Sequence, residues 1–359
     1  MESQRYNRQI ILDEVGASGQ EKLKQAKVLI IGLGGLGAAV LPYLAAAGIG
    51  EIGLLDDDVI DVSNLQRQVI YKTTAIGNQK VAEAAKMAVE LNPHVVINTV
   101  AERLSSKNAI ALFNQYDIIV DGTDNLSTKY LINDACCAIN KPFVYGSVFK
   151  FEGQVAVFNY DNGPSYRCVF PEENASAASC NEAGVMGISV GIIGMFQANE
   201  VLKMVLGIGQ TLSGKLLVYN MLTNEQQKFN VKKKDFLIAD RFAFDKKYNS
   251  IESAFDTITA TDLEQYINDE NSLLLDVRNP EEMPKLITTN CIAIPLSELA
   301  TNLDAIDSDK TIVVFCQSGI RSKKAIEILA SSGFKKLLNV SGGMSAISKI
   351  KNNEVVFTS

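Results

Sequence analysis

Short apolar runs alternate along this chain with segments in which apolar residues recur at helical spacing. Four runs have the length and composition of strands: 28–31, 52–55, 95–100 and 116–120. The segments 79–91 and 107–113, which separate the later runs, have the periodicity of helices. A long apolar helix is expected from 183 to 206, followed by strands at 216–219 and 226–231. Regular alternation of strand and helix predicts an α/β fold built on a largely parallel sheet.

The first strand runs into a glycine-rich turn. Gly32, Gly34 and Gly37 have the spacing of a tight turn that opens a helix, and a helix N-terminus favours a phosphate. The second strand ends in Asp56, about 20 residues further on, where a carboxylate accepts the hydroxyl groups of a ribose. Together these features predict a nucleotide site.

The residues that follow favour a triphosphate over a nicotinamide. Two cations and an amide come after Asp56: Asn64, Arg67 and Lys80. An NAD enzyme would place a largely apolar wall here. Asp124 follows the strand at 116–120 and should reach the same sheet edge, where it would hold Mg²⁺ on the phosphates. The alternative is that Asp124 caps a helix that begins near Asn125.

Composition narrows the class of protein. The 359 residues allow two or three domains, and 47% hydrophobic content is ample for their cores. A net charge of −7 does not favour binding to the phosphates of a nucleic acid or to an anionic membrane, so neither is expected as a partner. The uncharged stretch 28–50 contains glycines and Pro42, which argues against a membrane span. Six cysteines without a framework of short even spacings suggest reduced thiols and a cytoplasmic protein.

The last third of the chain repeats the α/β pattern on a smaller scale. We expect domains at 1–231 and 251–359, joined by a charged linker at 232–250. The second domain should contain a helix at 258–267, strands at 273–278, 291–296 and 311–316, and a helix at 322–334. Cys316 ends the third strand, at the start of a strand-to-helix loop. The N–H groups of such a loop and the helix dipole favour a thiolate or persulfide anion.

Eight motifs in residues 1–230 resemble those of the adenylating enzymes that activate ubiquitin-like sulfur carriers, the MoeB and ThiF branch of the E1 superfamily. They are RYNRQIIL, GLGGLG, LLDDD, SNLQRQ, the Lys80 segment, GTDN, YRCVFPE and CNEAGVMG. The resemblance implies a Rossmann-like adenylation domain with a mixed sheet. It also implies use of ATP and Mg²⁺ to adenylate the C-terminal glycine of a carrier that ends in Gly-Gly.

The resemblance also implies roles for individual residues. The cofactor-binding set is Gly32, Gly34, Gly35, Gly37, Asp56, Asp58, Ser63, Asn64, Gln66, Arg67, Lys80, Asp124 and Asn125. Arg8 matches an arginine that reaches the nucleotide site of the neighbouring subunit, which implies a homodimer. A carrier carboxylate is already ionised at neutral pH and needs no general base. Arg8, Arg67, Lys80 and magnesium held by Asp124 would therefore act catalytically by offsetting phosphate charge.

The cysteines follow the family only in part. Cys180 falls at the position of a family cysteine on the loop across the adenylate site, where it would accept an acyl group or resolve an intermediate; an ordinary small residue is the alternative. Relatives usually hold zinc with two Cys-x-x-Cys pairs. Here the first pair is Ser165 and Cys168, and no cysteine lies between Cys180 and Cys291, so we expect no zinc site. Core positions are expected for the remaining thiols, Cys136, Cys137 and Cys291.

The second domain resembles a rhodanese domain in its DVR, CQSGIRS and SGGM segments. The resemblance implies that Cys316 carries a persulfide sulfur, with Arg321 closing the loop. A phosphatase loop is the alternative, but it would place five residues between Cys316 and Arg321, and this chain has four. The smaller loop favours sulfur.

The two halves together predict an adenylyltransferase and sulfurtransferase. The Cys316 persulfide would attack the acyl adenylate, and reduction of the acyl disulfide, with Cys180 as a candidate, would release a thiocarboxylate. A cysteine desulfurase or thiosulfate would donate the sulfur. Molybdopterin, thiamine, cysteine or tRNA sulfur chemistry would use the product. Two alternatives are an NAD-dependent oxidoreductase with an appended sulfurtransferase and a non-catalytic carrier-binding scaffold.

Overall fold

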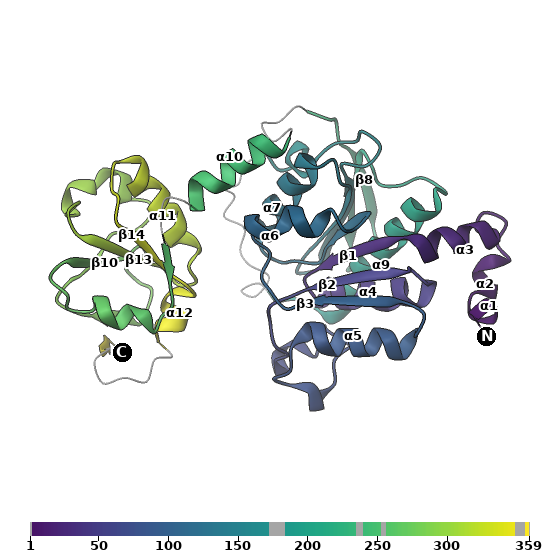
Figure 1. The fold of residues 1–359 in the computed structure, drawn as a ribbon, viewed down its shortest axis with the longest axis horizontal. Helices are drawn as coiled ribbons and strands as arrows, with labels where there is room; N and C mark the ends of the chain where they lie inside the picture. The colour runs from purple at the N-terminus through teal and green to yellow at the C-terminus, as the bar shows by residue number, and fades with distance from the viewer. Residues whose placement is uncertain (1, 172–183, 235–239, 253–255, 349–355, 359) are drawn as a thin grey trace. The chain divides into compact units, whose positions relative to one another are not determined.

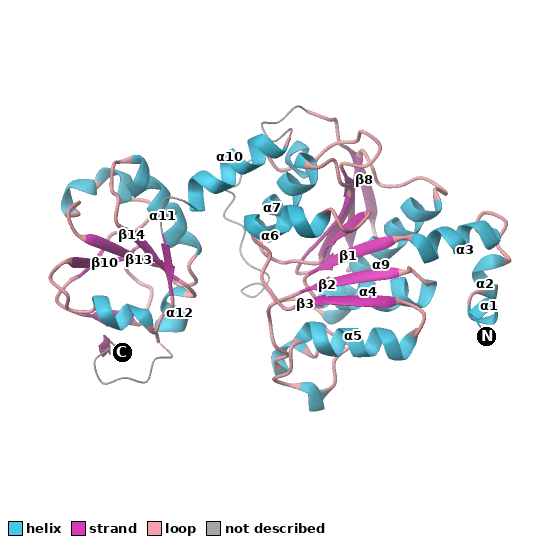
Figure 2. Cartoon of the chain, viewed as in Figure 1, coloured by secondary structure: helices cyan, strands magenta, loops and turns pink. Residues whose placement is uncertain are grey.

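The computed structural model describes residues 2–171, 184–234, 240–252, 256–348 and 356–358. Two compact units make up the chain, Met1–Phe244 and Asp245–Ser359. Both are α/β structures in which helices surround a sheet, as Figure 2 shows. This agrees with the alternation of apolar runs and helical segments in the sequence.

The larger unit is built on an eight-stranded mixed sheet with the order β3-β2-β1-β4-β5-β6-β7-β8. Its strands are β1 (Lys27–Ile31), β2 (Glu51–Leu55), β3 (Val96–Val100), β4 (Ile118–Asp121), β5 (Phe143–Phe149), β6 (Glu152–Phe158), β7 (Lys215–Asn220) and β8 (Gln226–Asn230). The first five strands in this order pair in parallel and the last three add antiparallel. The prediction of a Rossmann-like domain with a mixed sheet is confirmed.

Helices cover the sheet in two groups (Figure 1). They are α1 (Glu2–Arg5), α2 (Asn7–Ile10), α3 (Gly16–Gln25), α4 (Gly35–Ala47), α5 (Lys80–Leu91), α6 (Ser106–Phe113), α7 (Leu126–Ala138) and α9 (Gly187–Leu206). Helix α4 packs against both α5 and α9, while α6 packs against α7. Right-handed crossovers place helices from the two halves of such a sheet on opposite faces.

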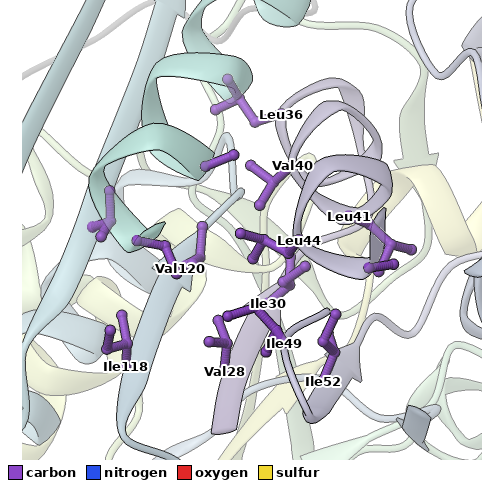
Figure 3. Close-up of a cluster of buried hydrophobic side chains, with 14 of the residues drawn as sticks. Val28, Ile30, Leu36, Val40, Leu41, Leu44, Ile49, Ile52, Ile118 and Val120 are labelled. Carbon is purple, nitrogen blue, oxygen red and sulfur yellow. The ribbon is translucent and has the colours of Figure 1, made fainter. Parts of the chain in front are cut away.

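The core of this unit lies between α4 and one face of the sheet (Figure 3). Its central side chains are apolar and at most 6% exposed: Val28, Ile30, Leu36, Val40, Leu41, Leu44, Ile49, Ile52, Ile118 and Val120. Because β1 is buried on both faces after its exposed first residue, Lys27, the remaining residues VLII are a continuous apolar run and do not alternate. This packing fixes the end of β1, and with it the start of the glycine turn.

Helix α9 has the length and apolar composition of a membrane-spanning helix, and half of its apolar window is buried inside the fold. The core helix of a folded domain meets the same criteria. Here α9 packs on α3, α4 and strands β5 and β6. The sequence prediction of a buried helix that ends at Leu206 agrees with this placement.

The smaller unit is built on a five-stranded parallel sheet with the order β12-β10-β13-β14-β9. Its elements are α10 (Arg241–Glu252), β9 (Asp256–Ile258), β10 (Ser272–Asp276), β11 (Lys285–Ile287), β12 (Cys291–Ala293), β13 (Thr311–Phe315), α11 (Ile320–Ser331), β14 (Leu337–Val340), α12 (Gly343–Ile347) and β15 (Val356–Thr358). Helix α10 begins within the charged segment expected to be the linker. That segment has no Pro or Gly to prevent a helix.

The prediction of a helix at 258–267 is wrong. Strand β9 ends at Ile258, and only a short 3₁₀ turn forms over Asp262–Tyr266. The Asp262 carboxylate accepts hydrogen bonds from the backbone N–H of Thr259 (3.0 Å) and from its hydroxyl (2.7 Å). The N–H of Asp262 donates back to the Thr259 hydroxyl at 3.2 Å, and such reciprocal bonds are typical of a helix N-terminus. The helical turn that follows ends at Tyr266 and does not continue as an α-helix.

Candidate functional site

The glycine turn links β1 to α4, and its glycines serve different purposes. Gly32 has a left-handed backbone, with φ of +84°. A Cβ at Gly37 would lie 2.0 Å from the carbonyl oxygen of Gly32, and one at Gly35 would lie 2.6 Å from Val190. Gly34 differs, because its nearest neighbour would be 3.9 Å away, at Gln68. Of these four glycines, Gly34 is therefore the one that keeps a surface open, whereas the others permit the turn and its packing.

A cavity of about 850 Å³ opens in front of this turn. It lies beyond the carboxyl ends of the parallel strands, the usual ligand position in open α/β sheets. Twelve of the predicted cofactor-binding residues line it: Gly32, Gly34, Gly35, Asp56, Asp58, Ser63, Asn64, Gln66, Arg67, Lys80, Asp124 and Asn125. Its size is in the range of cavities that hold nucleotide-sized ligands.

Two predicted residues of the larger unit do not line this cavity, Gly37 and Arg8. Gly37 lies behind the turn, where it allows the backbone of α4 to approach Gly32. Arg8 is an exposed residue of α2 and does not line the cavity. Cys180 lies outside the described residues. The roles predicted for Arg8 and Cys180 stay predictions.

Asp56 is held in one orientation by the backbone. Its carboxylate accepts a hydrogen bond from the N–H of Leu33 at 2.6 Å and another from the N–H of Asp58 at 2.8 Å. Burial raises the pKa of this carboxyl group, and the bond from Leu33 opposes that shift. Each oxygen uses one lone pair in these bonds, so acceptor capacity remains for two ribose hydroxyls.

Lys80 places its ammonium group at the cavity wall. It is the first residue of α5, its side chain is 6% exposed, and its Nζ lies 2.7 Å from Asp58 Oδ2. Arg67 donates to the carbonyl oxygen of Ser63 at 3.0 Å, which closes the turn that carries both residues. Both cations therefore lie beside the glycine turn in the same cavity.

Asn125, and not Asp124, caps helix α7. Its Oδ1 accepts from the N–H groups of Ser127 and Thr128. The alternative in which Asp124 serves as the cap is therefore wrong. Asp124 is exposed in the cavity, and no hydrogen bond to its carboxylate is found among the described residues. Its charge is available to a ligand or cation.

The cavity is more acidic than the motifs indicated. Among the described residues, six carboxylates line it: Asp56, Asp57, Asp58, Asp61, Glu102 and Asp124. Three cations from the same part of the chain face them: Arg67, Lys80 and Arg103. Sequence reasoning missed Glu102 and Arg103, although they follow β3 and β3 pairs with β2, the strand that ends in Asp56. The carboxylate oxygens of Asp56, Asp57 and Asp58 lie within 4.8 Å of one another, a set that offers hard oxygen ligands.

A buried ion pair supports the strand ends beneath the cavity. Lys129 Nζ lies 2.8 Å from Asp121 Oδ2, and both side chains are at most 6% exposed. The same ammonium group donates to the carbonyl oxygen of Gly146 at 2.9 Å. This pair ties the end of β4 to α7 and β5. Neither residue was predicted from the sequence, because nothing in the local pattern places charges there.

Hydrogen bonds close the segment at 165–168, where the family resemblance suggests the first zinc ligand pair. Cys168 Sγ accepts from the N–H of Ser165 at 3.4 Å and from the N–H of Lys234 at 3.3 Å. A thiol thus joins the turn at 165–168 to the chain beyond the sheet. The expectation of no zinc stays a prediction.

In the smaller unit, Cys316 follows β13 at the start of the loop that leads into α11. Its side chain is 1% exposed. The sulfur accepts a hydrogen bond from the N–H of Gly319 at 3.1 Å. The Ser322 hydroxyl lies 3.6 Å from the sulfur and donates to Asn339 Oδ1 at 2.7 Å. Gly319 has φ of +90°, which lets the loop turn its N–H toward the sulfur. The loop can stabilise a sulfur anion as predicted.

Arg321 follows this loop in the first turn of α11 and forms an ion pair with Glu282. It makes two parallel bonds to the Glu282 carboxylate, at 2.5 and 2.7 Å. These bonds lower the pKa of Glu282 to about 2. Arg278 of the DVR segment is fully buried and pairs with Asp276 at 2.7 Å, so that segment is structural. Arg321 is therefore held in an ion pair with Glu282, which already neutralises its charge.

Comparison with known proteins agrees with both units. The ThiF family matches residues 6–237, and the rhodanese-like domain family matches residues 259–350. A "Probable molybdopterin-synthase adenylyltransferase" of Porphyra purpurea is 38% identical, over 98% of this chain and 94% of its own length. The "Probable adenylyltransferase/sulfurtransferase MoeZ" of Mycobacterium tuberculosis is 37% identical over the same shares.

Two further matches concern the larger unit. The "Sulfur carrier protein adenylyltransferase" of Thermus thermophilus is 45% identical, over 65% of this chain and 88% of its own length. The crystal structure of E. coli MccB with AMPCPP and MccA aligns with a TM-score of 0.56 and 24% identity, over 64% of this chain and 72% of that one, and shows the same fold. The chain belongs to the ThiF family and carries a rhodanese-like domain in its last third.

Proposed function

We propose that this protein adenylates the C-terminal glycine of a ubiquitin-like sulfur carrier with ATP and then transfers sulfur to it from Cys316. The observation that carries the first step is the cavity in front of Gly34, where Asp56, Arg67 and Lys80 meet. Its residues match the needs of a nucleotide. Asp56 accepts ribose hydroxyls, and the cations offset phosphate charge.

The charges of the cavity support a role for Mg²⁺ and for a second subunit. Among the residues that the structure describes, six lining carboxylates outnumber three lining cations, so ATP would meet excess negative charge from this part of the wall. Additional positive charge is needed for binding. Asp124 and the Asp56–Asp58 cluster would hold the ion, and Arg8 from a second copy would supply a further cation. A homodimer follows from this proposal, with Arg8 reaching across.

The chemistry uses few protein groups. A carrier carboxylate oxygen attacks the α-phosphorus, and the bond to the bridging oxygen breaks to release pyrophosphate. The outer sulfur of a Cys316 persulfide then attacks the acyl carbon, and AMP leaves. This forms an acyl disulfide. A thiol, with Cys180 as the candidate, attacks the Cys316 sulfur of that acyl disulfide. The carrier thiocarboxylate leaves, and a Cys180–Cys316 disulfide remains, which an external dithiol reduces for the next turnover.

The partners follow from these steps. They are a small carrier protein with a Gly-Gly end and a sulfur donor, either a cysteine desulfurase or thiosulfate. Reduced thiols and the net charge of −7 support a cytoplasmic location without membrane or nucleic-acid partners. No observation on the structure favours the nicotinamide oxidoreductase or the non-catalytic scaffold.

The test is to incubate the full chain with ATP, Mg²⁺, a Gly-Gly carrier and thiosulfate and to measure the carrier mass. We expect a gain that corresponds to one sulfur in place of one oxygen. Cys316→Ala should abolish this gain and retain carrier-dependent pyrophosphate exchange. Cys291→Ala, which alters another thiol of the same unit, is the control and should retain both activities. Loss of pyrophosphate exchange in Cys316→Ala would contradict the assignment of adenylation to the larger unit and of sulfur transfer to the smaller unit.

A further inference from the structure

Gln68 is the cavity residue whose environment the proposed chemistry leaves unexplained. It directly follows Arg67 and lines the cavity, yet its side chain is only 2% exposed. Its Oε1 is fully enclosed and has no hydrogen-bond partner. No bond to its Nε2 is found among the described residues either. Buried carboxamides are normally paired, because an unpaired buried polar group lowers stability.

The position of the side chain is set by its neighbours. Tyr71 donates its hydroxyl hydrogen to the carbonyl oxygen of Leu33 at 3.0 Å, which holds the segment that carries Gln68 against the glycine turn. Gln68 Nε2 is the atom nearest to the place where a Cβ at Gly34 would stand, at 3.9 Å. The amide donor therefore borders the open space in front of Gly34.

That space also lies at the N-terminus of α4, for which Gly34 is the N-cap residue. The first N–H groups of a helix lack partners within the helix and favour an anion. The helix terminus and the amide nitrogen of a buried side chain thus border the same open space. A leucine of similar size at position 68 would avoid the cost of the unpaired amide, so the fold alone gives no reason for glutamine.

We propose that Gln68 is a phosphate-binding residue whose Nε2 donates a hydrogen bond to a phosphoryl oxygen seated at Gly34. This inference rests on the proposed nucleotide function and adds to it a residue outside the predicted set. Phosphoryl oxygens accept hydrogen bonds and do not donate them at neutral pH, so the donor end of the amide is the end that the ligand requires.

The test measures binding of Mg²⁺ with AMPCPP, AMP and adenosine to the full chain by calorimetry. Gln68→Leu should bind AMPCPP about 10- to 100-fold more weakly, the usual range for a bond to a charged group, and bind adenosine unchanged. Its unfolding temperature should rise by about 2–4 °C, because the unpaired amide is gone. Gln68→Glu should weaken AMPCPP binding further, because a carboxylate repels phosphate.

Gln20→Leu is the matched control. Gln20 is also buried, but it lies away from the cavity, and its amide is paired with Ala47 O at 3.0 Å and with Gln9 at 2.8 Å. This variant should lower the unfolding temperature and leave affinity unchanged. If the wild type binds AMPCPP and both Gln68 variants bind it equally well, or if adenosine binding falls as much, the inference is wrong and the proposed function stands. If the wild type itself binds no AMPCPP, the proposed function fails.

Discussion

The two units hold their reactive groups in opposite ways. In the larger unit, a cavity of about 850 Å³ is lined by side chains from the ends of several strands and from the loops between them. In the smaller unit, one loop of a single crossover encloses the sulfur of Cys316, and the nearest donor is the backbone N–H of Gly319 at 3.1 Å. One site is assembled from distant parts of the chain, and the other is local.

The difference reflects the size of what each site has to hold. A nucleotide spreads charge over many atoms, so its site needs several cations and acceptors that converge from separate elements. A single sulfur atom needs only a few N–H groups and a helix N-terminus, which one loop provides. A substitution in the assembled site should therefore affect one activity strongly and leave the local site untouched.

The largest expected effect concerns Lys80. Lys80→Met should reduce carrier-dependent pyrophosphate exchange by about 10²–10³-fold, because one preorganised charge at the phosphates is lost. Sulfur transfer from thiosulfate to cyanide, measured on the same sample, should stay unchanged. Lys27→Met is the control, since Lys27 also forms an ion pair, with Glu51 at 2.8 Å, but is 48% exposed. Equal loss of both activities in Lys80→Met would show that the two sites are not separate.

The glycine turn provides a second test, because structural and ligand-facing glycines lie side by side. Gly37→Ala should lower the free energy of unfolding of the larger unit by about 3 kcal/mol, since its Cβ would meet the Gly32 oxygen at 2.0 Å. Gly34→Ala should change stability by less than about 1 kcal/mol and weaken nucleotide binding. Denaturant unfolding and calorimetry measure these two effects. A Gly34→Ala protein with full affinity would remove Gly34 from the ligand surface.

The smallest expected effect concerns the stability of the smaller unit at acidic pH. In the folded protein, the bond to Arg321 lowers the pKa of Glu282 to about 2, against an ordinary value of 4.5. The pair therefore stabilises the fold above pH 4.5, and this contribution is lost as the pH falls toward 2. In Glu282→Gln, unfolding of the smaller unit should be easier than in wild type at neutral pH. The two unfolding curves should converge near pH 2, and a constant difference across that range would contradict the assignment.

Much of this architecture is readable from local pattern. The strands that carry the glycine turn, Asp56 and Cys316 were predicted because short apolar runs bounded by turn residues persist in the fold. The α-helix predicted at 258–267 is absent because Ile258 pairs with Val340 in the sheet, and only a 3₁₀ turn forms over Asp262–Tyr266. Strands β5 and β6 were not predicted, because Gly146 and Gly153 interrupt their apolar runs.

The sequence by itself determined the family, the order of the strands and helices around the cavity, and the residues of the local Cys316 loop. Those features depend on neighbours within a few positions along the chain. The tertiary structure decided that Gly34 is the open glycine, that Asn125 caps α7, and that Glu102, Arg103 and Gln68 share the cavity. The physical reason is distance along the chain. These contacts form only when the ends of β1, β2, β3 and β4 meet at one edge of the sheet.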